Sequence, residues 1–453
     1  MIDVSRLKAA SGTINKSHAG FLLYKKRLKN LLIISPYFPP VNAADMQRVR
    51  MSLPYFADHG WNAEVVIIDE NYTDMGKDPL LLQSIPQTIK VHKVKALDKK
   101  WTSKLGLGSI ALRSLPFYRK KVNELLKTGK YDLIYFSTTQ FPVCILGNYW
   151  KKRFGIPYVI DMQDPWHSDY YKNKPKDQQP PKYWFSYRLN KYLEPIAMKN
   201  VDGLISVSEK YIDNLKNRYP KIASIPAEVI TFGAFEPDLK IANDNRESFP
   251  HLLKKGFKNI VYIGRGGNDM HKALNVLFEA FKEALTADKE TFKQLQFYFI
   301  GTSYAPSGQG TPSIVPLAKQ YGIEDHVIEI TDRISYYYTL ATLQQADALF
   351  IPGSDDPAYT ASKIYPYLLT QKPILAIFNK ESSAVDILKE YGLQTVYSYQ
   401  DAPKSSIIIF LKKIITGDAT TQEYNKSAVK KYSAANMALK QCELFNKVIN
   451  GEN

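Results

Sequence analysis

Short apolar runs alternate with helix-like stretches along almost the whole chain of 453 residues, and this alternation constrains the fold most strongly. Each run is strand-sized and is bounded by turn residues, which is typical of buried parallel strands. Alternating strands and helices predict a doubly wound α/β sheet with helices on both faces. The first series predicts strands over residues 31–35, 63–69, 89–94, 131–137, 156–161 and 203–207.

A polar stretch then interrupts the alternation and is predicted to be a linker. A second series follows, with strands expected over 259–263, 296–300, 326–330, 348–351, 374–378 and 395–397. Helical patterns are clearest over 45–59, 273–287 and 335–345. We therefore expect a basic extension (1–29), a Rossmann-like domain (30–235), the linker (236–257), a second Rossmann-like domain (258–420) and a C-terminal helix (421–453).

Composition excludes several classes of protein. No stretch approaches the roughly 18–20 apolar residues that a membrane-spanning helix needs, and the N-terminus lacks the apolar core of a signal peptide. The two cysteines, Cys144 and Cys442, cannot form a disulfide framework or a four-cysteine zinc site. These features predict a soluble, cytoplasmic protein.

The positive charge is concentrated in one half of the chain. Residues 1–240 contain 37 lysines and arginines against 22 acids, whereas residues 241–453 contain 23 against 22. Such an imbalance suits an anionic partner, either a nucleic acid or an acidic bilayer surface. For any single basic cluster, a solvated helix face is the simpler explanation. An aromatic and basic run over 170–192 fits base stacking, a membrane interface or a core-facing helix.

A glycine-rich turn follows the first strand of the second series. Gly264-Arg265-Gly266-Gly267 leads into a helix that begins near Lys272. Glycines allow a ligand to approach the backbone, and a helix N-terminus favours anions. The turn lacks the signatures of a Walker A loop and of a dinucleotide-binding loop, so a plain tight turn stays open.

A longer stretch, Ile351 to Leu369, leaves a strand through Pro352-Gly353-Ser354 and enters a helix that carries Ser362-Lys363. Together with Gly264-Arg265 and Lys272, this stretch resembles the retaining glycosyltransferases of family four, which have the GT-B fold. That family shows a Gly-Arg…Lys segment and, later, a Ser-Lys-x-x-Glu-Tyr-Leu helix.

The first domain carries its own part of the resemblance. Ser35-Pro36-Tyr37-Phe38-Pro39-Pro40 and the following Asn42-Ala43-Ala44…Arg48 are similar to the family's Tyr-Phe-Pro-Pro…Gly-Gly…Arg opening. Asp161 to Trp166 resembles its Asp-x-Arg-Asp-x-Trp segment, with Gln163 in place of the arginine, and Ser206 to Glu209 resembles its Val-Ser-Glu. The resemblance extends over about residues 30–450, with the motifs in the same order.

The resemblance implies two Rossmann-like domains facing across a cleft and transfer of a hexose-type sugar from a nucleotide-sugar, with retention, to a glycan or lipid-linked acceptor. It implies no cofactor and no obligatory metal, and a role in cell-surface polysaccharide or glycoconjugate synthesis. The catalytic residues it implies are Arg265, Lys272 and Asp164. The donor-binding residues are Gly264, Gly266, Gly301, Asp332, Arg333, Ser354, Tyr359, Thr360, Ser362 and Lys363. The acceptor-side residues are Asn42, Ala43, Ala44, Arg48 and Trp166.

The chain departs from the family pattern on the donor helix. Ala358 and Pro366 occupy the positions of the family's glutamate pair, and neither can bind a ribose hydroxyl through its side chain. Two alternatives therefore stay open: another GT-B enzyme, such as a sugar-nucleotide epimerase, or a degenerate, non-catalytic binding subunit. The basic first domain predicts peripheral association with the inner face of an anionic membrane, and nucleic-acid binding is a weaker expectation.

Overall fold

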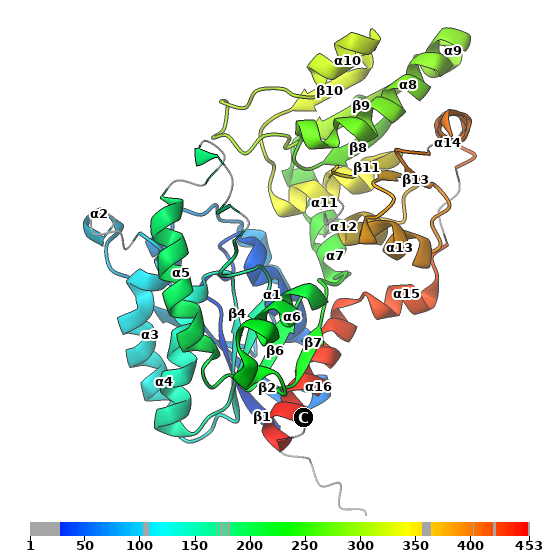
Figure 1. Cartoon of the computed structure of the whole chain (residues 1–453). Helices are drawn as coiled ribbons and strands as arrows, with labels where there is room; N and C mark the ends of the chain where they lie inside the picture. Colours follow the sequence, from blue (N-terminus) through cyan, green and yellow to red (C-terminus); the bar gives the residue numbers. More distant parts are fainter. Residues whose placement is uncertain are drawn as a thin grey trace, which may run out of the picture.

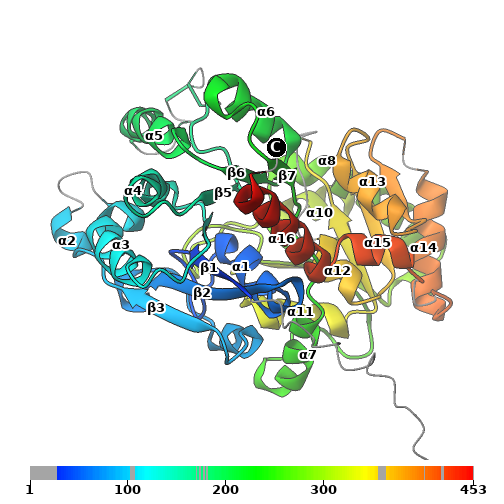
Figure 2. The ribbon, with the colours of Figure 1, turned by 90° about the horizontal axis from the view of Figure 1, so that it is seen from below.

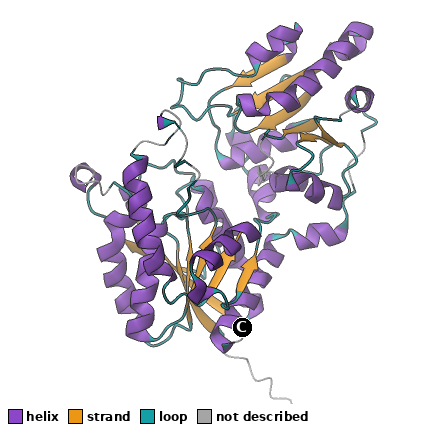
Figure 3. Ribbon diagram, viewed as in Figure 1, coloured by secondary structure: helices purple, strands orange, loops and turns teal. Residues whose placement is uncertain are grey.

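The computed structural model of the chain describes residues 28–102, 108–169, 171–172, 175–176, 179, 182–355, 364–401, 403–419 and 423–451. These residues form two α/β domains, each with strands between layers of helices (Figure 3). In Figure 1 the first domain lies at the lower left and the second at the upper right, and the red C-terminal helix returns to the first domain. Two parallel sheets flanked by helices confirm the predicted fold class.

The first sheet has seven strands, all parallel, in the order β3-β2-β1-β4-β5-β6-β7. Strand β1 pairs Leu31 with Ala63 of β2 on one side and with Leu133 of β4 on the other. Six strands were predicted, and the seventh was missed because its residues, Ala-Glu-Val, form no apolar run. The strands are β1 (Lys29–Ile34), β2 (Trp61–Ile68), β3 (Lys90–Val94), β4 (Leu133–Ser137), β5 (Tyr158–Met162), β6 (Gly203–Ser206) and β7 (Ala227–Val229).

Helices cover both faces of this sheet (Figure 2). One core packs the sheet against α3 (Ile110–Leu126), α4 (Ile145–Phe154), α5 (Tyr183–Met198) and α6 (Glu209–Arg218). The opposite core packs it against α1 (Gln47–Ser52) and α16 (Ala434–Asn450). Further short helices are α2 (Lys99–Thr102), η4 (Glu70–Tyr72), η5 (Pro79–Ser84), η7 (Phe141–Cys144) and η9 (Pro220–Ile222).

The helical segment predicted over 45–59 is not one continuous helix. The segment is divided into η1 (Ala44–Met46), α1, η2 (Leu53–Tyr55) and η3 (Ala57–His59). Pro54 lies in the first turn of η2. Because proline has no backbone N–H to donate and its ring crowds the preceding turn, it fits a helix start better than a helix interior.

The second sheet has six parallel strands in the order β10-β9-β8-β11-β12-β13. All six correspond to predicted strands: β8 (Lys258–Ile263), β9 (Leu295–Ile300), β10 (Val327–Ile330), β11 (Ala348–Pro352), β12 (Ile374–Phe378) and β13 (Val396–Ser398). Its helices are η11 (Asn268–Met270), α8 (His271–Ala287), α9 (Lys289–Phe292), α10 (Val315–Tyr321), η12 (Glu324–His326), α11 (Tyr336–Gln345), α12 (Ile364–Leu369), α13 (Ser383–Glu390) and α14 (Lys404–Thr416).

The segment 236–257, predicted as a polar linker, contains two helices, α7 (Pro237–Asp244) and η10 (Arg246–Ser248). Ile241 and Ala242 of α7 are buried beside Leu340 of α11, which belongs to the second domain. The connection between the domains is therefore a packed helix rather than an extended linker.

The chain crosses between the domains a second time near its end, and the two crossings touch. The backbone N–H of Ala234 donates to the carbonyl of Tyr432 at 2.7 Å, and that of Ala434 donates to the carbonyl of Ala234 at 2.8 Å. The C-terminal segment, predicted as one helix over 421–453, is divided into α15 (Lys426–Lys431) and α16. Ser433 separates them and caps α16 by accepting from the backbone N–H of Asn436 at 3.1 Å.

No helix within the described ranges is both long and apolar enough to cross a membrane.

Candidate functional site

A cavity of about 240 Å³ lies at the carboxyl ends of β8, β9 and β10 in the second domain. In open parallel sheets this edge is where ligands bind. Five residues that the sequence analysis discussed line this cavity: Gly264, Arg265, Gly301, Arg333 and Pro366. Pro366 is the residue that occupies a glutamate position of the family. The lining residues are Ile263, Gly264, Arg265, Ile300, Gly301, Tyr304, Arg333, Ile334, Tyr336, Thr339, Leu340, Leu343, Pro366 and Tyr367.

The glycines of this edge allow close backbone packing. Gly301 has φ +74°, in the left-handed region where a side chain is strained, and its N–H donates to the carbonyl of Ile330 at 2.7 Å. The N–H of Gly264 donates to the carbonyl of Ile300 at 2.8 Å. A Cβ atom on Gly266 would lie only 2.9 Å from Cβ of Thr302. Gly266 and Gly301 are thus required by the joining of the strand ends.

Arg265 is held by a carboxylate that the sequence analysis did not single out. Its two terminal nitrogens bind Asp269 at 2.9 and 2.6 Å, and the same carboxylate accepts from the hydroxyl of Ser354 at 2.7 Å. Burial alone raises the pKa of Asp269, but hydrogen bonds from Arg265 and Ser354 outweigh burial and lower that pKa. The sequence offered no clear signal for Asp269, because residues 265–267 form a loop and the helical spacing rule does not apply there.

Lys272 does not line the cavity. It is exposed on the first turn of α8, and its Nζ atom lies 5.7 Å from the centre of the Tyr399 ring. Lys272 therefore stands beside Tyr399, directly after β13, while Arg265 stands at the cavity itself.

Asp332 and Arg333 have different surroundings although they are adjacent. The Asp332 carboxylate accepts from the Ser307 hydroxyl at 2.6 Å and from the backbone N–H of Gly308 at 2.9 Å, so it holds the loop after β9. Arg333 lines the cavity, and its guanidinium lies 5.0 Å from the centre of the Tyr304 ring. Of these two predicted donor residues, only Arg333 faces the cavity.

Arg48, predicted on the acceptor side, is in the core of the first domain instead. Its side chain is 0% exposed, and Nε lies 2.7 Å from Oδ2 of Asp161. It also donates to the carbonyl of Ile230 at 2.8 Å. The prediction that Arg48 borders the cleft is therefore wrong, because a guanidinium without exposed surface cannot contact a substrate.

Gln163, the residue that replaces the family's arginine, belongs to the same buried network. Its amide nitrogen donates to the Ser137 hydroxyl at 3.0 Å and to the Asp161 carboxylate at 3.1 Å. Since Arg48 already supplies the positive charge beside Asp161, a neutral donor is sufficient at this position.

The remaining first-domain residues divide between surface and interior. Asn42 is half-buried, Ala43 is buried and Ala44 is exposed. Asp164 is exposed at the end of β5, yet its surroundings reduce its solvation; this desolvation and the charge of Asp45 raise its pKa. Trp166 is 5% exposed and stacks on Phe141 with ring centres 5.4 Å apart. Of these residues, the acceptor-side Asn42 and Ala44 and the catalytic candidate Asp164 offer side chains to solvent.

A second cavity, of about 310 Å³, is lined by both domains. Ser208 and Glu209 of the predicted Val-Ser-Glu motif contribute from the first domain. Tyr365 and Ser383 contribute from the second domain, and the Tyr365 hydroxyl lies 3.5 Å from that of Thr231. The motif therefore lies where the domains meet.

Four predicted donor residues, Tyr359, Thr360, Ser362 and Lys363, fall within 356–363 together with Ala358, outside the described residues. Within the described part of the chain, no group of three or more His, Cys, Asp or Glu side chains is arranged to hold a metal ion.

Comparison with known proteins agrees with this architecture. Residues 85–233 match the family model described as Glycosyltransferase Family 4. No curated protein matches the chain.

Solved structures match along almost the full length. Anabaena HepE in complex with UDP is 16% identical, with a TM-score of 0.53, and the match covers 92% of this chain and 100% of that one. A UDP-forming α,α-trehalose-phosphate synthase from Burkholderia xenovorans, in complex with glucose-6-phosphate, is 10% identical with the same coverage and a TM-score of 0.53. A variant of S. aureus TarM, in complex with fondaparinux, α-GlcNAc-glycerol and UDP, is 12% identical with a TM-score of 0.51, again covering 92% of this chain and 100% of that one.

At these identities the structural likeness establishes the fold, and the family match adds the sequence relationship within the first domain. The chain has the GT-B fold, and its residues 85–233 match the Glycosyltransferase Family 4 model.

Proposed function

We propose that the protein transfers a sugar from a nucleoside diphosphate donor to a glycan or lipid-linked acceptor. The observation that carries this proposal is the cavity at the carboxyl edge of the second sheet, with Arg265 in its wall. The GT-B fold and the family match support it. The similar solved structures in complex with UDP make a uridine nucleotide the first donor to test.

The cavity has the chemistry to hold the nucleoside. Arg333 and Tyr304 offer a cationic plane and an aromatic ring, and Pro366 adds an apolar surface. Thr339 lines the same cavity, but its hydroxyl already donates to the carbonyl of Ser335 at 3.0 Å. In this proposal the nucleoside is held largely by stacking and apolar contact rather than by a ribose-gripping glutamate.

The diphosphate is assigned to the mouth of the cavity. Arg265 supplies positive charge from the cavity wall, and the N-terminus of the 17-residue helix α8 adds its dipole. Lys272, exposed on the first turn of α8, adds a second positive charge outside the cavity. These groups stabilise the negative charge that develops on the leaving diphosphate, so the proposal requires no resident metal.

The proposed reaction retains the anomeric configuration. The bond from the anomeric carbon to the diphosphate oxygen breaks, and the acceptor oxygen bonds to that carbon from the same face. The acceptor proton passes to the departing diphosphate oxygen, so no protein base is needed. Asp164, whose pKa is raised by desolvation, is assigned to orienting the acceptor.

The proposal has three further parts. The donor carries a hexose, the acceptor belongs to a cell-surface polysaccharide or glycoconjugate, and the protein lies on the cytoplasmic face of the membrane as a peripheral protein. The membrane location is supported by the positive charge of residues 1–240, which contain 37 of the 60 lysines and arginines of the chain.

The test is a thermal-shift and calorimetric screen of the purified protein against UDP-, GDP-, ADP- and dTDP-sugars, followed by turnover with a binding donor. Arg265→Ala is expected to lower turnover by about 10²-fold, the scale of losing one charge-stabilising donor. Arg246→Ala is the matched control, because Arg246 is exposed and pairs only with the neighbouring Glu247 among the described residues. Equal turnover in the two variants would rule out the role of Arg265.

Pro366 in the cavity wall favours a second candidate, a binding subunit that does not catalyse transfer. Donor binding without release of free nucleoside diphosphate in the presence of acceptors would support that candidate. Conversion of the donor sugar without an acceptor would instead indicate an epimerase.

A further inference from the structure

Three neighbouring helices of the first domain carry a strong excess of positive charge. Helices α3, α4 and α5 cover one face of the first sheet (Figure 2) and contain nine lysines and arginines against two acids. One of those acids, Glu194, is fully buried and ion-paired with Arg218 at 2.5 Å, which leaves Glu124 as the one exposed acid of the three helices.

The cations of these helices are largely on the solvent side. Two of the nine are used within the fold: Arg113 is buried and donates to the carbonyl of Leu97, and Lys151 is ion-paired with Asp202. The other seven are exposed or half-exposed: Arg119, Lys120, Lys121, Lys152, Arg153, Arg188 and Lys191. We call this surface the basic face.

Helix α5 adds large aromatic side chains to the basic face. Trp184 is 64% exposed and Tyr192 is 71% exposed, values that no core packing explains. The Arg188 guanidinium lies 5.6 Å from the centre of the Trp184 ring, so cation and aromatic ring are presented together. Tryptophan and tyrosine interleaved with lysine and arginine on one helix are typical of a segment that lies in a membrane interface.

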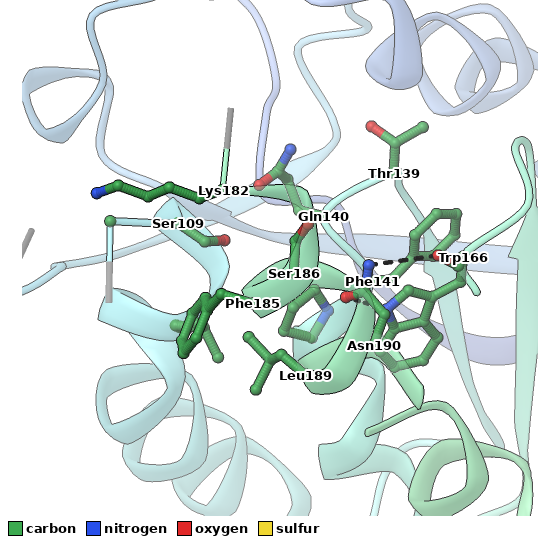
Figure 4. Close-up of a pocket in the computed structure, with 13 residues that line it drawn as sticks. Ser109, Thr139, Gln140, Phe141, Trp166, Lys182, Phe185, Ser186, Leu189 and Asn190 are labelled. Atoms are coloured by element: carbon green, nitrogen blue, oxygen red, sulfur yellow. Dashed lines mark hydrogen bonds between the residues drawn. The ribbon is translucent and has the colours of Figure 1, made fainter. Parts of the chain in front are cut away.

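A cavity of about 350 Å³ opens beside the same helix, between α5 and the start of α3. Figure 4 shows Phe185 and Leu189 of α5 along it, with Phe141 and Trp166, while Lys182 extends away from this aromatic pair. The Trp166 indole N–H donates to Asn190 at 3.1 Å and fixes the ring in the wall.

The cavity also adjoins the acceptor edge of the first domain. Thr139 and Gln140 of its wall follow β4, and Trp166 follows β5, two residues after Asp164. The cavity therefore lies between two helices of the basic face, α3 and α5, and reaches the edge to which the proposed function assigns the acceptor.

We infer that the basic face docks on an anionic lipid bilayer and that the cavity between α3 and α5 takes the apolar part of a membrane-borne acceptor. The docking surface rests on charge and exposure alone, whereas the role of the cavity rests on the proposed function. A nucleic acid would also meet the positive charge, but the apolar cavity and the exposed tryptophan favour lipid.

Docking is tested by cosedimentation with phosphatidylcholine vesicles, with and without phosphatidylglycerol. The protein is expected to bind the anionic vesicles preferentially. Arg188→Gln/Lys191→Gln is expected to weaken that binding by about 30-fold, the effect of removing two surface cations. Lys412→Gln/Lys413→Gln on α14 is the matched control, because it removes the same charge from exposed positions of the second domain. Three results would overturn the docking surface: the same loss of vesicle binding in both double variants, equal binding to neutral and anionic vesicles, or tighter binding to duplex DNA than to vesicles.

The cavity is tested with dodecyl phosphate below its micelle concentration, measured by calorimetry. Ser186 lines the cavity from an exposed position, so Ser186→Trp is expected to fill the cavity and abolish binding without disturbing the core. Ser405→Trp makes the same substitution at an exposed position of α14 in the second domain and should leave binding unchanged. Absent binding in the unmodified protein, or unchanged binding in Ser186→Trp, would overturn the assignment. Vesicle binding by a protein that binds no nucleotide-sugar would reject the proposed function and leave the docking surface standing.

Discussion

Two arginines of α1, two residues apart, are both fully buried and both ion-paired, yet they stabilise different parts of the molecule. Arg48 pairs with Asp161 inside the first domain. Arg50 pairs with Asp238 of α7, which lies in the connection to the second domain. Their comparison separates what holds one domain together from what holds the two domains against each other.

The Arg48 pair is shared among strands of one sheet. Besides Arg48, the Asp161 carboxylate contacts the hydroxyl of Ser137 at 2.9 Å and the amide of Gln163 at 3.1 Å. Burial raises the pKa of Asp161, and the charge of Arg48 opposes that rise. All of these groups belong to the first domain.

The Arg50 pair is shared between domains. Both terminal nitrogens of Arg50 donate to Asp238 at 2.6 Å, and the hydroxyls of Tyr336 and Tyr337 donate to the same carboxylate at 2.8 and 2.9 Å. These tyrosines begin α11 of the second domain, and Tyr336 also lines the donor cavity. One buried carboxylate therefore joins the first domain, the connecting helix and the wall of the proposed donor site.

The tryptophans make the comparison measurable. All five of them, at positions 61, 101, 150, 166 and 184, belong to the first domain. During urea unfolding, tryptophan fluorescence therefore follows the first domain, and circular dichroism follows both.

The largest effect is expected from Asp238→Ala, which leaves the Arg50 guanidinium buried without a counter-charge. Removing one partner of a buried pair costs about 3–5 kcal/mol. We expect both unfolding midpoints to fall and to separate from each other, because the coupling between the domains is lost. Asp244→Ala on the same helix removes a half-exposed partner of Lys240 and should cost less than about 1 kcal/mol. A loss in Asp238→Ala no greater than in this control would refute the coupling.

Asp161→Asn is expected to cost somewhat less, about 2–3 kcal/mol, because the amide oxygen still accepts hydrogen bonds while the charge beside Arg48 is lost. The fluorescence midpoint should fall, and its separation from the dichroism midpoint should stay as in the unmodified protein. Asp58→Asn, at an exposed position in η3, serves as the control. Midpoints that diverge in Asp161→Asn would show that this pair, too, acts between the domains.

Tyr336→Phe and Tyr337→Phe each remove one hydrogen bond to Asp238 and retain the ring. Each is expected to cost about 1 kcal/mol, the usual contribution of one such bond. Because Tyr337 is fully buried outside the donor cavity and Tyr336 lines it, the two variants share their stability loss and differ only in what they present to a ligand. A loss confined to one of them would show that Asp238 is held by a single tyrosine in solution.

The alternation of apolar runs was sufficient to predict the two sheets, because a strand buried on both faces has to be apolar throughout. It failed where local chemistry departs from that rule, at the polar strand β7 and at Pro54, which divides the predicted helix. For the site, Gly264, Arg265, Gly301 and Arg333 follow strands and so meet at one edge. Arg48 was misplaced because spacing along a motif does not reveal which side of a short helix faces the core.

The smallest stability effect is expected from a third arginine pair, Arg265 with Asp269, whose side chains are 28% and 29% exposed. Asp269→Asn should change the free energy of unfolding by less than about 1 kcal/mol, because water can solvate both groups. Nucleotide affinity should nevertheless change, since Arg265 loses the charged partner that fixes it beside Ser354. Glu290→Gln serves as the control, because Glu290 lies on α9 and its ion pair with Lys293 is exposed. This variant should alter neither the free energy of unfolding nor the nucleotide affinity. Of the three arginine pairs, Arg265–Asp269 is expected to contribute least to the free energy of unfolding, and its side chains are the ones accessible to a ligand. Unchanged nucleotide affinity in Asp269→Asn would mean that Arg265 is positioned by other contacts.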